Sequence, residues 1–165
     1  MQTLLSRRRA LAALAGAAAA TAIVLRRPAA RPADAFTYTL SDAQWRAKLS
    51  PEAYDVLRHE GTETAFTSPL LGEHRKGTFV CAGCALALFD AKTKFDSGTG
   101  WPSFYAPLPR AVATRTDATL GMERTEVHCR RCGGHLGHVF DDGPPPTGLR
   151  YCMNGVALGF VPAKG

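Results

Sequence analysis

The fold is decided by the stretch Cys129-Arg130-Arg131-Cys132-Gly133-Gly134-His135-Leu136-Gly137-His138. Its two cysteines have the same spacing as those of an upstream segment, Cys81-Ala82-Gly83-Cys84. Two cysteines separated by two residues bind one ion through a tight turn, and two such pairs complete a tetrahedral thiolate site. The small residues near each pair leave room for the backbone to wrap the ion. The sequence therefore predicts one structural zinc, with no open position for substrate, bound by Cys81, Cys84, Cys129 and Cys132. Two disulfides, or a redox-active cysteine pair, are the alternative interpretations.

One cysteine remains outside this set. Cys152 lies in the segment Arg150-Tyr151-Cys152-Met153-Asn154. A lone cysteine in a domain that also carries a histidine pair, here His135 and His138, is a candidate nucleophile. In the alternative interpretation, the imidazoles are ordinary core or surface groups and the cysteine is buried and inert. His128 is interpreted as structural.

The charge of the chain is unevenly distributed. The 165 residues carry a formal net charge of +6 and a pI near 9.3. Six arginines but only one acidic residue fall within residues 1–35, which leaves 14 basic and 13 acidic groups in residues 36–165. A nearly neutral domain of this length indicates one folded unit and gives no reason to expect a nucleic-acid partner. We expect a monomer.

Residues 1–35 have the layout of an export signal. Arginines at 7–9 precede an alanine-rich apolar run at 10–25, and Ala33 and Ala35 form an A-x-A cleavage pattern. The apolar run is shorter than the ~20 residues of a membrane span. We therefore expect a twin-arginine-like signal and a location in the bacterial periplasm. An uncleaved N-terminal membrane anchor or an organelle transit peptide are the alternatives.

The remaining sequence predicts short helices followed by strands. Ser41 with Gln44 fits a capping box, and Ser50-Pro51-Glu52 fits a second helix start with Gly61 as its stop. Residues from 76 onward alternate apolar and polar positions between Gly, Pro and Asp, which favours antiparallel strands. The expected strands are Gly77–Val80, Leu86–Phe89, Ala111–Thr116, Arg124–His128, Val139–Phe140, Tyr151–Asn154 and Leu158–Val161. The predicted fold is mainly β with a helical N-terminal flank.

A turn at residues 97–104 presents Trp101 and Phe104 as core anchors or as the wall of a small apolar pocket. The ordered motifs C-x-x-C, Gly-Trp-Pro-Ser-Phe, C-x-x-C, His-Leu-Gly-His-Val-Phe and Arg-Tyr-Cys-x-Asn closely resemble the methionine-R-sulfoxide reductases of the B type. The resemblance extends from about Tyr38 to Pro162 and includes Phe66-Thr67-Ser68-Pro69 and Lys94-Phe95-Asp96-Ser97-Gly98.

This resemblance implies two small antiparallel sheets with N-terminal helices. It also implies an oxidoreductase that repairs oxidatively damaged proteins or peptides by reducing their methionine-R-sulfoxide. A thiolate would attack the sulfoxide sulfur, a histidine would supply protons, and the cysteine would become a sulfenic acid. The residues that match the family's catalytic positions are Cys152, His135, His138 and Asn154. Those assigned to substrate binding are Trp101, Phe104 and Arg150, and Arg150 can also favour the thiolate. Zinc is the expected cofactor, with no organic cofactor.

One position departs from the family pattern. Many members carry a second, resolving cysteine where this chain has Thr99. The other four cysteines are assigned to zinc, so we expect an external reductant, either a thioredoxin-like protein or a small thiol. The alternative function is a zinc-stabilised interaction module without catalysis. A zinc hydrolase is disfavoured, because four thiolates leave the metal no open position.

Overall fold

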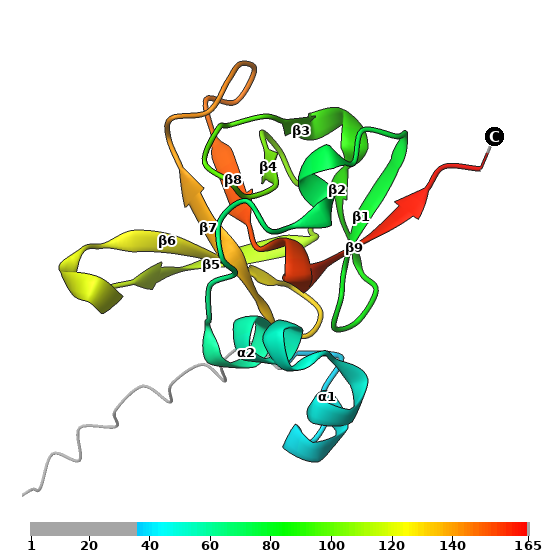
Figure 1. Ribbon diagram of the computed structural model, residues 1–165. Coiled ribbons are helices and arrows are strands. Elements are labelled where there is room, and N and C mark those ends of the chain that lie inside the picture. Colours follow the sequence, from blue (N-terminus) through cyan, green and yellow to red (C-terminus); the bar gives the residue numbers. More distant parts are fainter. Residues whose placement is uncertain (1–35, 165) are drawn as a thin grey trace, which may run out of the picture. The chain divides into compact units, whose positions relative to one another are not determined.

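The computed structural model describes residues 36–164, and Figure 1 shows their arrangement. Two short helices, α1 (Asp42–Lys48) and α2 (Pro51–His59), come first. The strands within this range are β1 (Gly77–Cys81), β2 (Ala87–Asp90), β3 (Lys94–Phe95), β4 (Ser103–Phe104), β5 (Val112–Asp117), β6 (Arg124–Cys129), β7 (His135–Phe140), β8 (Arg150–Met153) and β9 (Leu158–Pro162). Single 3-10 turns are η1 (Pro69–Gly72), η2 (Ala91–Thr93), η3 (Thr119–Gly121) and η4 (Gly155–Ala157).

The two helices begin where the sequence predicts. Ser41 caps α1, and its capping box with Gln44 is complete, while the Ser50 hydroxyl caps α2. The end of α2 differs by one residue from the prediction. Glu60, and not Gly61, adopts the left-handed conformation, with φ of 60°. The Glu60 carboxylate pairs with the guanidinium of Arg115 on β5.

The strands form two antiparallel sheets, which confirms the predicted fold class. The smaller sheet has the order β2-β1-β9, and the larger has the order β3-β4-β8-β7-β6-β5. In Figure 1 the β5–β6 hairpin extends to one side of the larger sheet, and the helices lie below it. The chain crosses from β8 to β9 through η4, so an inner strand of the larger sheet is directly connected to the smaller sheet.

Aromatic side chains fill the space between the sheets. Phe104 of β4 stacks on Phe89 of β2 with ring centroids 4.3 Å apart, and it meets Phe79 of β1 edge-on at 4.9 Å. All three rings are fully buried. Offset and edge-to-face pairs of this kind stabilise a core beyond their buried area. This cluster joins the two sheets and gives the strands that carry the site a rigid support.

Two parts of the strand prediction need correction. β7 begins at His135 and not at Val139, so the histidine pair lies on a strand. The two-residue strands β3 and β4 have no predicted counterpart, because segments this short have no periodicity to detect.

The predicted export signal at 1–35 lies outside the described residues. Within the described range, no helix is long and apolar enough to cross a membrane.

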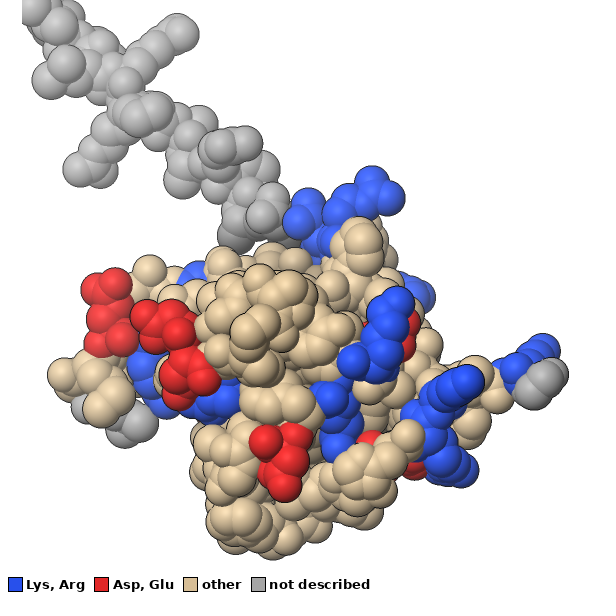
Figure 2. All heavy atoms as spheres, turned by 90° about the horizontal axis from the view of Figure 1, so that it is seen from above, with Lys and Arg blue, Asp and Glu red and all other residues tan. Residues whose placement is uncertain are grey.

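The charged side chains of the domain are of both signs. On the face drawn in Figure 2, acidic and basic groups both occur at the edges, and uncharged residues cover most of the middle. Several ion pairs join neighbouring groups, such as Arg46 with Asp42 and Arg75 with Glu73. This distribution agrees with the near-neutral charge of residues 36–165.

Candidate functional site

A β-bulge places the two histidines on the same face of the larger sheet. His128 of β6 is paired with His135, Val127 with Gly137, and Glu126 with His138. The register shift leaves Leu136 as the extra residue of β7. Without it, two residues three apart on a strand would point to opposite faces. With it, the imidazole rings lie 5.4 Å apart, edge to face.

Cys152 lies at the centre of this face. On β8 it is directly opposite His138 of β7 and, on its other side, directly opposite Ser103 of β4. Residues paired in this way share one face of a sheet, so the thiol and the imidazole are neighbours. The close approach of the two strands depends on Gly137, since a Cβ there would lie 2.0 Å from the Cys152 carbonyl oxygen.

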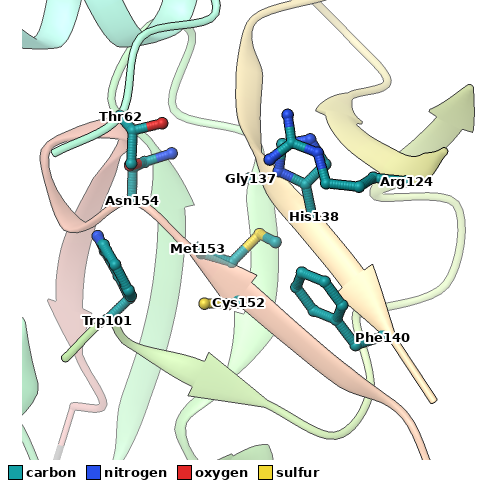
Figure 3. Close-up of a pocket in the computed structure, with 9 residues that line it drawn as sticks. All are labelled: Thr62, Trp101, Arg124, Gly137, His138, Phe140, Cys152, Met153 and Asn154. Carbon is teal, nitrogen blue, oxygen red and sulfur yellow. The ribbon is translucent and has the colours of Figure 1, made fainter. Parts of the chain in front are cut away.

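A pocket of about 130 Å³ opens over this pair. In Figure 3 the Trp101 indole and the Phe140 ring lie on either side of Cys152, with His138 and Arg124 beyond them. Cys152 is partly exposed, whereas the other four cysteines are buried. The inert-module interpretation required a buried Cys152, which this arrangement does not provide. The full lining is Thr62, Trp101, Arg124, Gly137, His138, Phe140, Cys152, Met153 and Asn154.

The wall of the pocket is built around the backbone of Glu63. The Trp101 indole Nε1 donates to the Glu63 carbonyl at 2.9 Å, and the Glu63 N–H donates to Asn154 Oδ1 at 2.9 Å. The amide Nδ2 of Asn154 donates to the Leu136 carbonyl at 3.1 Å. The buried Glu63 carboxylate accepts the Gly155 N–H, and burial raises its pKa. Asn154 and Trp101 are therefore held rigidly beside Cys152.

Each histidine is bound by a carboxylate from the β5–β6 hairpin. Nδ1 of His135 lies 2.7 Å from Glu126 Oε1, and both side chains are buried. Nε2 of His138 lies 2.8 Å from Asp117 Oδ2. Burial alone would raise the pKa of Glu126, but the hydrogen bond from His135 and the charge of Arg115 outweigh it, so that pKa is lowered. Burial lowers the pKa of His138 more than the hydrogen bond to Asp117 raises it.

Arg150 lies on the same face of β8 but is bound by an acidic loop residue. Its Nε and Nη2 each donate to the Asp142 carboxylate at 2.8 Å, and this bidentate pair raises the pKa of the guanidinium. The guanidinium also lies over the Phe140 ring, 4.4 Å from its centroid. Cys152 contributes to the shift only weakly. Arg150 is thus near the thiol, but it does not line the pocket.

Phe104 was expected at the substrate site, and the structure places it elsewhere. It is fully buried between the sheets and is not part of the pocket lining. The preceding residue explains this, because Ser103 shares the face of Cys152 and Phe104 therefore points to the core. His135 also does not line the pocket, although its ring contacts that of His138.

Hydroxyl groups contact the thiol from the turn before β4. Thr99 Oγ1 lies 3.8 Å from Cys152 Sγ. Ser97 Oγ is 2.8 Å from both Thr99 Oγ1 and Ser103 Oγ, which fixes the Thr99 side chain. The residue at the position of the family's resolving cysteine thus touches Cys152 directly. It offers a hydrogen bond but no sulfur.

The four remaining cysteines come together at the opposite end of the domain. Their sulfurs all lie within 4.8 Å of one another and all four residues are buried. The Sγ–Sγ distance is 3.7 Å for Cys81 and Cys132, and 3.5 Å for Cys84 and Cys129. A zinc ion with Zn–S bonds of ~2.3 Å has ligand sulfurs about 3.8 Å apart. The predicted ligand set is confirmed as a possible metal site that joins the β1–β2 turn to the β6–β7 turn.

The chemistry of these thiols also fits a bound cation. Hydrogen bonds with the neighbouring thiols, above all that of Cys129, lower the pKa of Cys84. The same kind of hydrogen bond, again with Cys129 as the main partner, raises the pKa of Cys81. Four crowded sulfurs cannot all ionise by themselves, and a divalent cation removes that conflict. Trp45 of α1 and Leu57 of α2 pack beside the turns, and Arg58 donates to the Cys132 carbonyl at 3.2 Å. The helices therefore cover the metal site.

Several site residues were not anticipated from the sequence. Thr62, Glu63 and Arg124 belong to the pocket or its wall but to none of the quoted motifs. Phe140 ends the His-Leu-Gly-His-Val-Phe motif, but no role was predicted for it. The position of Asp117 near the site becomes clear only from the register of β5 and β6, which pairs it with Arg124. The alternation of charged residues along Arg124–Cys129 is the one local signal that could have indicated a polar face.

Comparisons with known proteins agree with this geometry. The family described as the SelR domain matches residues 49–162. The peptide methionine sulfoxide reductase MsrB of Thiobacillus denitrificans is 60% identical over 123 residues, which cover 74% of this chain and 93% of the relative. The proteins of the same name from Leptospira interrogans and Pseudomonas putida strain W619 are 55% identical over 121 residues and 58% identical over 123 residues. These alignments cover 73% and 74% of this chain and 92% of each relative.

Proposed function

The chain belongs to the SelR-domain family of peptide methionine sulfoxide reductases, and on that premise we propose that it reduces methionine-R-sulfoxide in peptides and proteins through a sulfenic acid on Cys152. It is an oxidoreductase that acts on a sulfur group. The observation that carries the proposal is the register of β7 and β8, which places Cys152 opposite His138 at a small pocket walled by Trp101.

The pocket has the chemistry that a methionine sulfoxide side chain requires. The indole of Trp101 and the ring of Phe140 supply apolar surface for the methyl group. His138 supplies an imidazole that, when it carries a proton, can give that proton to the sulfoxide oxygen. Thr62 and Asn154 border the pocket, but the amide of Asn154 is already hydrogen-bonded to the backbone. We therefore assign Asn154 to holding the pocket wall.

The reaction is a transfer of one oxygen atom from the substrate sulfur to the enzyme sulfur. The Cys152 thiolate attacks the sulfoxide sulfur, and the sulfoxide oxygen accepts protons. The bond between this oxygen and the methionine sulfur breaks, and a bond between oxygen and the Cys152 sulfur forms. The products are methionine and Cys152 sulfenic acid, so the methionine sulfur is reduced and the cysteine sulfur is oxidised. Arg150 lies on the same strand as Cys152 and is held in place by Asp142.

Recycling then requires an outside thiol. Two external thiols, or one dithiol, reduce the sulfenic acid to the thiol with release of water and a disulfide. Thr99 offers only a hydroxyl beside Cys152, and the other four cysteines are buried in their own cluster. A thioredoxin-like protein or a small thiol is the proposed reductant.

The metal and the location complete the proposal. We assign zinc to the four-cysteine site, because soft thiolates in a closed tetrahedron are typical of structural zinc. When bound, the ion would connect the two sheets and take no part in the reaction.

We also propose that residues 1–35 direct the enzyme to the bacterial periplasm, because that segment has arginines followed by an apolar run.

The test is an activity assay on separated epimers. A peptide that carries one methionine sulfoxide is supplied as the pure R or the pure S form, with dithiothreitol as the reductant. We expect turnover of the R form alone, and none from the Cys152→Ser variant. Reduction of both epimers at similar rates, or undiminished activity of the variant, would contradict the proposal.

A further inference from the structure

The β5–β6 hairpin carries two cross-strand ion pairs, and each one presents a carboxylate to a histidine of β7. Arg115 is directly opposite Glu126, and Asp117 is directly opposite Arg124. The Arg115 guanidinium pairs with Glu126, whose other oxygen binds His135. Asp117 Oδ2 binds Arg124 Nη2 at 2.7 Å and His138 at 2.8 Å. Two arginine–carboxylate–histidine chains are therefore present, and the one that ends at His138 reaches the residue directly opposite Cys152.

The Asp117 carboxylate is a fixed negative charge. Its Oδ1 accepts the Thr119 N–H at 2.9 Å and the Thr119 hydroxyl at 2.6 Å, while its Oδ2 accepts the bonds from Arg124 and His138. The Thr119 bonds and then the bond from His138 hold the pKa of Asp117 well below its usual value. A carboxylate with four donors around it stays ionised and does not rotate.

We infer that Asp117 is a positioning residue for the reductase, which fixes the His138 ring beside Cys152 and favours its protonated form. The inference rests on the proposed function and adds a residue to it. An ionised carboxylate within hydrogen-bond distance favours the imidazolium. Because Asp117 binds Nε2, the nitrogen left to give a proton to the sulfoxide oxygen is Nδ1. A histidine ring fixed through one nitrogen so that the other can react is a recurrent arrangement.

Other charges around His138 act in both directions. Arg124 of β6, whose side chain lines the pocket, and a protonated His135 of β7 both oppose a charge on the ring. An ionised Cys152 on β8 favours that charge. Glu126 of β6 is opposite His138 in the register, but its carboxylate is bound by Arg115 and His135. Asp117 of β5 is therefore the anion that directly offsets the cost of burying a charged His138.

The test compares the Asp117→Asn and Arg124→Gln variants. Histidine ring NMR signals of the resting protein follow the titration of His138 without substrate, and single-turnover rates on a sulfoxide peptide follow the reaction. Loss of an opposite charge at this distance lowers a histidine pKa by about 1 unit or more. We expect the His138 midpoint and the alkaline limb of the rate profile to move down together in Asp117→Asn. In Arg124→Gln both should move up, because a neighbouring cation is removed.

Two controls separate the local carboxylate from other effects. Asp90→Asn removes a carboxylate from the smaller sheet, where it binds Lys92, and should leave the His138 midpoint unchanged. Thr119→Val removes one donor but keeps the Asp117 charge, and should give a smaller shift. An unmoved midpoint in Asp117→Asn, or the same shift in Asp90→Asn, would overturn the inference. If the His138 midpoint moves in Asp117→Asn but the pH–rate profile does not, the inference is overturned as well, whereas the proposed reductase function is unaffected. Absence of reductase activity in the wild type would overturn the proposed function itself.

Discussion

Replacing Thr99 with cysteine should convert the enzyme from external to internal recycling. Thr99 Oγ1 is already 3.8 Å from Cys152 Sγ, so a cysteine sulfur at 99 needs to approach by roughly 2 Å to form a disulfide. Thr99 is flanked by Gly98 and Gly100, and these residues have no Cβ to restrict the backbone as it adjusts. We expect Thr99→Cys to form a Cys152 disulfide after one turnover without reductant.

The size of the effect follows from the length of chain that the bond closes. Residues 99 and 152 are 53 positions apart. The chain-entropy relation gives about 4 kcal/mol of stabilisation for a loop of this length, before any strain in the folded state. For a domain of about 130 residues, this corresponds to a rise in Tm of roughly 15 °C. The oxidised variant should therefore melt well above the same protein after reduction.

The assay mixes one equivalent of R-sulfoxide peptide with protein whose cysteines are reduced and from which the small-molecule reductant has been removed. Non-reducing peptide mapping then identifies any bridge, and calorimetry gives Tm before and after dithiothreitol. Thr116→Cys, which places an extra thiol on an exposed position of β5, serves as the matched control and should form no bridge to Cys152. Quantitative peptide reduction by Thr99→Cys with Cys152 still trapped as a sulfenic acid, or the same bridge in the control, would refute the reasoning.

The remaining predictions concern the metal, the nucleophile, the histidines and the strand contact. Cys84→Ser should release the metal and lower Tm sharply, since structural zinc contributes ~10 kcal/mol or more to folding; full stability in verified metal-free, reduced protein would contradict this. Cys152→Ser should abolish turnover and keep the zinc content, checked by metal analysis. His138→Ala and His135→Ala should each slow single turnover by about 10²-fold or more, and a mere two-fold loss in both would remove them from the mechanism. Gly137→Ala should destabilise the fold by about 1–3 kcal/mol in denaturant titration, because its Cβ would meet the Cys152 carbonyl oxygen 2.0 Å away.

Features set by neighbouring residues were predictable from the sequence. The caps at Ser41 and Ser50 need only the next three residues, and both are observed. The ligand pairs are equally local, because each C-x-x-C forms its own tight turn before the two turns meet. The mainly β fold followed from short alternating segments. The assignment of Cys152 as the nucleophile stays a prediction, to which the structure adds its pocket and its neighbours.

Features set by pairing between distant strands were not predictable. The bulge at Leu136 has no mark in the sequence, yet it decides that His135 and His138 share a face. Phe104 is assigned to substrate binding with the resemblance, but one position along a strand reverses the face, and Phe104 points to the core. Asp117 and Glu126 gained their roles only when β5, β6 and β7 came into register.

One measurement tests the central claim most directly: a single turnover of the wild-type protein on an R-sulfoxide peptide, without reductant and with a dimedone-type probe present. The account predicts about one methionine formed per chain, one probe adduct on Cys152 and no new disulfide, because the sulfenic acid has no thiol partner among the described residues. A bridge from Cys152 to a cysteine of the metal cluster would contradict both the external recycling and the closed metal site.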